Sequence, residues 1–287
     1  MTGVLAALGA AIAWTAASGL WRSLSTVGPA WLLNILKNSL ATLCFLPVLL
    51  SIPWGGSGSG LIWLLLSGAV GIAVGDTFYL LALRRLGTRR TLTVEAIGPV
   101  LASIGSVSLM GEVLEPSAWV GACCVTAAVL LVAKNGASMG PADPTGLICS
   151  CLAVLCGLAG AFLARHVLTS SSLLPVQSAA VRLLGGWLCL LPFCGRALNQ
   201  LRLTNRMQGG AVVAAVLLGT NLGIVLQQIV FKSLPVGLGV SLMSTAPVFA
   251  LLISPIEREK IQILDACAAA LAVTGVALTV MAGSTGA

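Results

Sequence analysis

The chain has 287 residues, of which 58% are hydrophobic and only 8% are charged, and its formal net charge is +7. Soluble domains carry about 25% charged residues, so this composition excludes a water-exposed surface over most of the chain. The apolar residues come in blocks long enough to cross a bilayer as helices, not in the short alternating segments of a transmembrane barrel. The sequence therefore predicts an all-α polytopic membrane protein, whose basic residues bear on topology and not on nucleic-acid binding.

Ten apolar blocks predict ten transmembrane helices, since about 20 apolar residues cross a bilayer as a helix. The first block lacks the basic leading segment of a signal peptide, so we expect it to remain as a span. The chain is expected to be a multi-pass protein of the cell membrane, plasma or inner. In chain order the predicted spans are 3–21, 30–52, 60–83, 92–110, 117–133, 145–164, 174–195, 210–231, 236–255 and 262–282.

Two stretches of the chain resemble each other and indicate an internal repeat. GIAVGDTFYLLALRRLG at 71–87 aligns without gaps with GTNLGIVLQQIVFKSLP at 219–235. This alignment predicts two five-helix repeats, residues 1–138 and residues 139–287. Because five is odd, the second repeat must enter the membrane from the opposite side, which gives an inverted-topology repeat of the kind found in secondary transporters.

The basic residues between the spans are concentrated on the side opposite the termini. The loops on the termini side hold only Arg165 and Lys232. By the positive-inside rule, this distribution places both termini outside the cell. The arginines between 84 and 90 would then anchor the chain at the cytoplasmic surface, although a basic vestibule for an anionic substrate is an alternative. The loops opposite the termini hold Arg22, Arg84, Arg85, Arg89, Arg90, Lys134, Arg196, Arg202, Arg206, Arg258 and Lys260.

Three ionisable residues, Lys37, Asp76 and Glu95, fall inside predicted spans near one face of the membrane. An ionisable residue within a span is costly and suggests a functional site. Counted from the helix ends, Lys37 and Asp76 lie roughly 10 Å below that face, with Glu95 shallower. The three charges can therefore neutralise one another, and a desolvated carboxylate among them could exchange a proton near neutral pH. Arg182 is the corresponding base of the second half and is expected in the opposite leaflet.

Prolines and polar residues complete the candidate site. Pro99 and Pro247 interrupt the fourth and ninth helices at matching positions, and paired proline-interrupted spans point to the binding site of a transporter. In the structural alternative, the Asn and Gln side chains only join neighbouring helices and Trp14 is only a packing residue. The predicted substrate-binding residues are Trp14, Asn34, Lys37, Asp76, Tyr79, Glu95, Pro99, Arg182, Asn221, Gln227, Gln228, Ser244 and Pro247.

The sequence gives no indication of a cofactor, a metal site or an enzyme. Its nine cysteines lie mostly in apolar blocks without a CxxC pair, and it has one histidine. Cysteines in such positions usually act as small buried hydrophobic residues. The serines near His166 have no acid close in sequence, so an intramembrane enzyme is not expected.

The order of these features resembles the drug/metabolite transporter superfamily, EamA type. The resemblance rests on a glycine-rich third helix ending in YLLALRRLG, on EAIGPVLASIGSVSLMGEVL after it, and on IVFKSLPVGLGVSLMSTAPVFALLISPIEREKI in the second half. It implies an alternating-access carrier of small metabolites, often an exporter, with a central cavity between the two halves. Glu112 falls on the Gly-Glu pair that follows the fourth helix of the family. The family usually has cytoplasmic termini, which is opposite to the orientation that the basic residues indicate.

The expected function is secondary active transport of a small polar metabolite, an amino acid or a related compound. Asp76 or Glu95 would bind a coupling proton or a substrate ammonium group, and Lys37 would hold that acid or bind a substrate carboxylate. The expected partners are the small-molecule substrate, protons and the lipid bilayer, with no nucleic acid, and both a monomer and a homodimer are compatible with the sequence. The alternatives are a carrier of an anionic or lipid-linked substrate and a non-transporting membrane subunit.

Overall fold

The computed structural model describes residues 1–24, 29–52, 54, 58–86, 88–134, 143–195, 206–246, 249 and 263–285. All regular structure in these residues is helical, so the predicted all-α class is confirmed. The helices are α1 (Thr2–Ser23), α2 (Ala30–Cys44), α3 (Leu46–Leu50), α4 (Gly58–Gly68), η1 (Ala69–Gly75), α5 (Asp76–Leu86), α6 (Thr88–Glu95), α7 (Gly98–Met110), α8 (Pro116–Lys134), α9 (Pro144–Ser170), α10 (Pro175–Leu190), η2 (Leu191–Phe193), α12 (Arg206–Ala215), η3 (Val216–Leu222), α13 (Gly223–Ser233), α14 (Val236–Met243) and α16 (Ile263–Thr285).

Several helices are long and apolar enough to cross a membrane. Within the described residues five such helices are Gly60–Leu86, Thr93–Met110, Pro144–Ser170, Pro175–Phe193 and Met207–Ser233, and shorter apolar helices are Thr2–Ala17, Pro116–Leu131 and Cys267–Met281. The predicted spans 30–52 and 236–255 are represented by the shorter pieces α2, α3 and α14, and most of 247–255 lies outside the described residues. The count of ten spans therefore stays a prediction.

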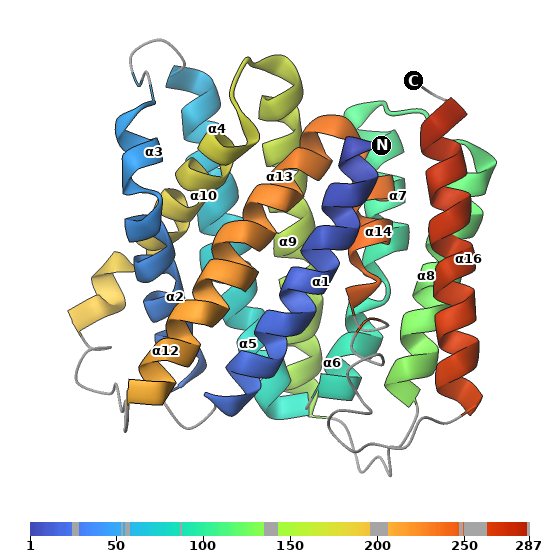
Figure 1. Ribbon diagram of the computed structural model, residues 1–287, viewed down its shortest axis with the longest axis horizontal. Coiled ribbons are helices and arrows are strands. Elements are labelled where there is room, and N and C mark those ends of the chain that lie inside the picture. The colour runs from blue at the N-terminus through green and yellow to red at the C-terminus, as the bar shows by residue number, and fades with distance from the viewer. Residues whose placement is uncertain are drawn as a thin grey trace.

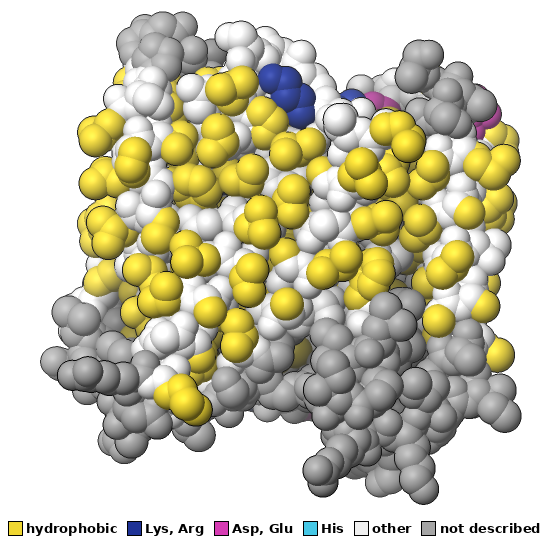
Figure 2. Space-filling view, viewed as in Figure 1, with side chains coloured by type: hydrophobic (Ala, Val, Ile, Leu, Met, Phe, Trp, Pro, Cys, Tyr) yellow, Lys and Arg dark blue, Asp and Glu magenta, His cyan; other side chains and the backbone are white. Residues whose placement is uncertain are grey.

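The helices run side by side in one bundle, and α1 begins at the same end of the bundle at which α16 ends (Figure 1). We call this the termini end, and the other end, where α5 meets α6, the opposite end. Apolar side chains cover much of the lateral face of the bundle, and the charged side chains that can be seen among the described residues lie near the termini end of that face (Figure 2). This distribution suits a surface that contacts lipid.

Two long helices each contain a π-helical segment. α4, η1 and α5 follow one another without interruption, as do α12, η3 and α13, and the middle segment of each is a seven-residue π-helix. In the alignment of 71–87 with 219–235, the two segments occupy matching places to within one residue. A π-helix changes the side-chain register of the residues that follow it and is frequent at functional sites.

Small residues allow α4 and η1 to pack very closely against the second half of the chain. A Cβ atom on Gly68 would overlap the backbone carbonyl of Arg182, and one on Gly160 would lie 3.1 Å from the Cα of Gly71. The Ser67 hydroxyl donates a hydrogen bond of 2.6 Å to the carbonyl of Gly160. This contact explains the run of small residues at 67–75 and fixes the π-helical segment η1 between α9 and α10.

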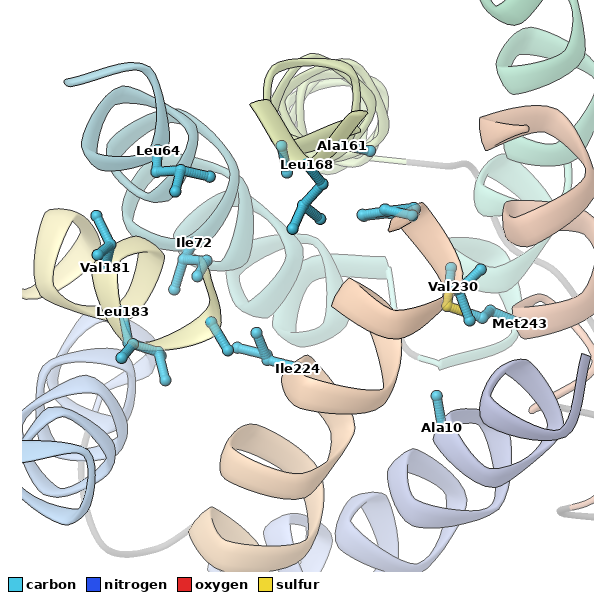
Figure 3. Packing of buried hydrophobic residues seen from close by; sticks show 14 of the residues in the cluster. Ala10, Leu64, Ile72, Ala161, Leu168, Val181, Leu183, Ile224, Val230 and Met243 are labelled. Atoms are coloured by element: carbon cyan, nitrogen blue, oxygen red, sulfur yellow. The ribbon is translucent and has the colours of Figure 1, made fainter. Parts of the chain in front are cut away.

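A single large apolar cluster joins helices from both halves of the chain. It includes Leu64 of α4, Leu183 of α10, Ile224 of α13 and Met243 of α14. Figure 3 shows these side chains pointing into the space between the helices. The polar residues discussed below are therefore set in an apolar interior, where the cost of an unpaired charge is high.

Candidate functional site

The partly buried Lys37–Asp76 ion pair is the centre of the candidate site. Lys37 projects from the middle of α2, and Asp76 is the first residue of α5, directly after the π-helical segment η1. The Lys37 ammonium donates to Oδ2 of Asp76. The side chain of Lys37 is 14% exposed and that of Asp76 is 36% exposed. The lysine is thus enclosed by protein, whereas its partner carboxylate still has an accessible edge.

Glu95 and Tyr79 lie near this pair. Glu95 is the last residue of α6, and a short turn separates it from the start of α7. Both carboxylates act electrostatically on Tyr79, and Asp76 also acts on Glu95. Glu95 and Tyr79 are both half-buried, and Glu95 forms no ion pair within the described part of the chain. The structure thus brings the two predicted acids and the predicted tyrosine into one neighbourhood.

Arg182 lies within electrostatic reach of Asp76, although the sequence analysis assigned it to the other leaflet. Its side chain is buried, with 3% exposure. Its Nη1 donates a 3.1 Å hydrogen bond to Oε1 of Gln227, and its Nε has no hydrogen-bond partner among the described residues. Within that part of the chain no carboxylate lies at ion-pair distance from Arg182. The guanidinium is therefore a buried cation whose one recorded polar partner is a neutral amide.

Asn34 supports the π-helical segment η1. Its Nδ2 lies 3.2 Å from the carbonyl of Ile72, 3.1 Å from that of Ala73 and 2.9 Å from the hydroxyl of Thr77. The side chain is fully buried. A π-helix leaves carbonyls out of the regular α-helical pattern, and the amide of Asn34 provides donors for two of them. In this structure Asn34 thus holds the backbone that leads into Asp76.

Trp14, Asn221 and Gln228 also make contacts between helices. The Trp14 indole donates to the carbonyl of Gly219 in η3 at 2.9 Å, and Asn221 Nδ2 donates to the carbonyl of Ala41 at 3.1 Å. Gln228 is fully buried and accepts a 2.9 Å hydrogen bond from Ser178. One amide atom of each of the two side chains, Asn221 Oδ1 and Gln228 Nε2, has no partner among the described residues. Trp14 and Asn221 join elements of the two halves, whereas Gln228 joins α13 to α10 within the second half. All three lie apart from the Lys37–Asp76 pair in their recorded contacts.

The prolines and Ser244 mark the ends of helices. Pro99 is buried in the first turn of α7, so the predicted interruption of the fourth helix is present as the gap between α6 and α7. Ser244 follows the last residue of α14 and is half-buried. Pro247 lies outside the described residues. The break at Pro99 places the end of α6, and with it Glu95, next to an irregular backbone segment.

Thr15 and Thr77 were not among the site residues predicted from the sequence. The Thr15 hydroxyl lies 2.9 Å from the carbonyl of Ala246, just before the second proline, and Thr77 accepts from Asn34 next to Asp76. In the sequence Thr77 directly follows Asp76 and Thr15 directly follows Trp14, and these neighbours were the available signal. A threonine within a span usually satisfies its hydroxyl on its own helix, however, so the sequence alone does not distinguish this role.

Part of the arginine cluster has a structural partner. Arg85 Nη1 lies 3.0 Å from Oδ2 of Asp143, and Oδ1 of Asp143 accepts from the backbone N–H of Thr145 at 3.0 Å. Asp143 therefore caps α9 and joins it to the end of α5. The hydrogen bond from Arg85 holds the pKa of Asp143 below its ordinary value. At least this arginine is engaged in the fold, which argues against a freely exposed basic vestibule.

The family model described as the EamA-like transporter family matches residues 1–134 and 144–281. The chain belongs to this family. It is therefore a membrane transporter of the drug/metabolite type, as the sequence resemblance indicated. A solved structure titled "Crystal structure of protein" shares the fold of this EamA-like transporter, with a TM-score of 0.80, 21% identity and coverage of 99% of both chains. No curated protein matches the sequence.

Proposed function

We propose that this EamA-like transporter is a secondary carrier that moves a small polar metabolite, an amino acid or a related compound, by alternating access between two inverted five-helix halves. The observation that carries the proposal is the unequal pairing of the four ionisable side chains in the site. Lys37 and Asp76 neutralise each other, whereas Arg182 and Glu95 have no ion-pair partner among the described residues. A substrate with one negative and one positive group would supply both missing partners.

Arg182 is the proposed receptor for the substrate carboxylate. An uncompensated buried cation costs several kcal/mol, and this cost is recovered when an anion binds. The guanidinium has a planar set of donors that matches a carboxylate. Its Nε is unused, and Gly71 beside Nη2 has no side chain that would fill the space. From the sequence, Lys37 was expected either to hold an acid or to bind a substrate carboxylate. In this structure its ammonium donates to Asp76, which leaves Arg182 for the carboxylate.

Glu95 is the proposed receptor for the substrate ammonium or for a coupling proton. It is a half-buried acid that has no ion-pair partner among the described residues. Asp76 lies close enough to act on Glu95 electrostatically, so the two acids belong to one site. This proximity is the basis for proton-linked transport in the proposal.

The two long helices that carry the site support the alternating-access part of the proposal. Their π-helical segments occupy matching places, and each accepts a hydrogen bond from another helix, η1 from Asn34 and η3 from Trp14. Two halves that have the same backbone architecture but different side chains can exchange conformations around a shared site. The site differs between the halves because Ile224 aligns with Asp76.

The test is proton release from the purified protein in liposomes as candidate amino acids and other metabolites are added. Wild type is compared with Asp76→Asn and Glu95→Gln, and with Glu115→Gln as the matched control, because Glu115 is exposed and lies outside the cluster. We expect a substrate-dependent signal that is lost in Glu95→Gln and retained in Glu115→Gln. Folded protein that gives no signal with any amine, acid or sugar would contradict the proposal and favour a lipid-linked substrate or a non-transporting subunit.

A further inference from the structure

A second buried ion pair lies at the termini end of the bundle. Glu112 follows α7, and both of its carboxylate oxygens are engaged: Oε1 accepts from Arg165 Nε at 2.8 Å, and Oε2 accepts from the backbone N–H of Val236 at 3.2 Å. The two charged side chains are each 13% exposed. Charge-assisted hydrogen bonds of this length in a partly dry environment are among the stronger polar contacts in a protein.

Arg165 extends this contact to a third helix. Its Nη1 donates to the carbonyl of Phe231 at 2.7 Å and to that of Lys232 at 3.1 Å. These carbonyls belong to the last turn of α13, where a helix has no internal donors for its carbonyls. The Lys232 ammonium in turn donates to the carbonyl of Leu173 at 2.7 Å. A cation at the end of α13 and a carboxylate at the start of α14 both match the dipoles of these helices.

The position of Glu112 is set by the backbone before it. Gly111 ends α7 with φ of +65°, a conformation that favours glycine, and the N–H of Glu112 bonds back to the carbonyl of Ser106 at 3.0 Å. The Ser106 hydroxyl accepts from the N–H of Gly237 at 2.7 Å. The end of α7 and the start of α14 therefore meet through two independent hydrogen bonds beside the ion pair.

The Glu112–Arg165 contact joins the two halves of the chain at the ends of four helices, α7, α9, α13 and α14. The other ion pairs recorded in the described residues differ from it. The Lys37–Asp76 pair lies within the first half, and the Arg85–Asp143 pair at the opposite end is far more exposed, with values of 50% and 33%. Within the described part of the chain, the termini end thus has the one ion pair that is both buried and shared between the halves.

We infer that the Glu112–Arg165 pair is the latch that keeps the carrier closed at the termini end, and that it opens when the site is exposed to that side. This inference rests on the alternating access of the proposed function. A buried ion pair suits this role because its formation costs desolvation and therefore gives little net stability, whereas its geometry is specific. When the halves separate, water enters and solvates both charges, which lowers the cost of the open state.

Hydrogen exchange measured by mass spectrometry on the full chain in lipid nanodiscs tests the latch without knowledge of the substrate. The variant is Glu112→Gln, which keeps the shape of the side chain but presents an amide donor to either Arg165 or Val236. We expect the amides of Val236–Met243 to exchange about tenfold faster, because a hydrogen bond to a charged group is lost and water reaches α14. Amides of Asp76–Leu86 at the opposite end should exchange at the wild-type rate or more slowly.

Two further variants separate a latch from a general loss of stability. Asp143→Asn weakens the ion pair at the opposite end, also between the halves, and should leave the exchange of α14 unchanged. Arg165→Lys retains the charge but cannot donate to Glu112 and to the end of α13 from a fixed planar group, so it should resemble Glu112→Gln. Unchanged exchange of α14 in Glu112→Gln, or equally faster exchange at both ends with a lower melting temperature, would overturn the inference.

The exchange result is independent of the transport assay. If Glu112→Gln opens the termini end while no substrate gives a proton signal, the latch stands and the assignment of a proton-coupled substrate fails. If the proton signal is present and α14 exchanges normally in the variant, transport stands and the latch fails.

Discussion

At the scale of single residues, the two buried bases of the candidate site have different electrostatic situations. Lys37 is paired with Asp76, so removing its charge leaves a carboxylate without its counter-ion. Arg182 has a neutral partner, Gln227, so removing its charge removes a cost. A buried charge without a counter-ion lowers the stability of the fold, so replacing it with an apolar side chain can raise stability. Removing one partner of a buried ion pair creates such a charge and lowers stability. The two bases should therefore respond to the same substitution with opposite changes in stability.

This contrast is tested by Arg182→Met and Lys37→Met. We expect Arg182→Met to leave the free energy of unfolding unchanged or to raise it by about 1 kcal/mol, and to abolish substrate-dependent proton release. Lys37→Met should lower the free energy of unfolding, by less than the ~3–5 kcal/mol of a fully buried pair because Asp76 is partly exposed. Thermal or denaturant unfolding in detergent measures both. Strong destabilisation by Arg182→Met would assign Arg182 to the fold and remove it from the site.

At the scale of helices, much of the architecture can be predicted because the bilayer selects long apolar blocks. The predicted span 60–83 corresponds to Gly60–Leu86, and the predicted span 145–164 is the first part of Pro144–Ser170. The proline signal also located the break after Glu95 correctly. The π-helical segments were not predictable, since their stability depends on donors such as Asn34 that come from other helices. Local composition carries no information about such tertiary partners.

The same limit applies to the site. Lys37 and Asp76 could be paired from their depth alone, because adjoining helices and the cost of charge in lipid leave few other partners. The proximity of Arg182 to Asp76 could not be predicted from depth, since it depends on the close packing of α10 against α4 and η1. That packing follows from the absence of side chains at Gly68 and Gly185, which allows the backbones to come together.

The close packing of α4 against α10 is tested by Gly68→Ala. The added methyl group would overlap the backbone carbonyl of Arg182, which cannot rotate away as a side chain could. We expect a loss of at least about 2 kcal/mol in the free energy of unfolding, as in overpacked cores, and lower transport because Arg182 is displaced. Gly157→Ala is the matched control, since a Cβ there meets no atom within 4 Å. The control should be neutral or gain up to about 1 kcal/mol from helix propensity, and equal effects of the two changes would contradict the packing argument.

At the scale of the whole molecule, the two ends of the bundle are held together by ion pairs of different character. The Glu112–Arg165 pair at the termini end is largely enclosed, and the Arg85–Asp143 pair at the opposite end faces solvent. Salt screens an exposed pair much more than an enclosed one. We therefore expect the Arg85–Asp143 contact at the opposite end to respond more strongly to the ionic strength of the medium than the Glu112–Arg165 contact at the termini end.

This asymmetry predicts a pH-dependent effect of Asp143→Asn. Asparagine still caps a helix well, so the substitution removes mainly the charge that faces Arg85. The hydrogen bond from Arg85 lowers the pKa of Asp143 in the folded state below 3.8. A lowered folded-state pKa stabilises the fold above the unfolded pKa, and this contribution is lost as the pH falls through the folded pKa. The melting temperature of wild type should therefore exceed that of Asp143→Asn at pH 7, and the difference should vanish at pH values below the folded pKa and shrink in high salt. A difference that persists at low pH would show that the carboxylate acts through something other than its charge.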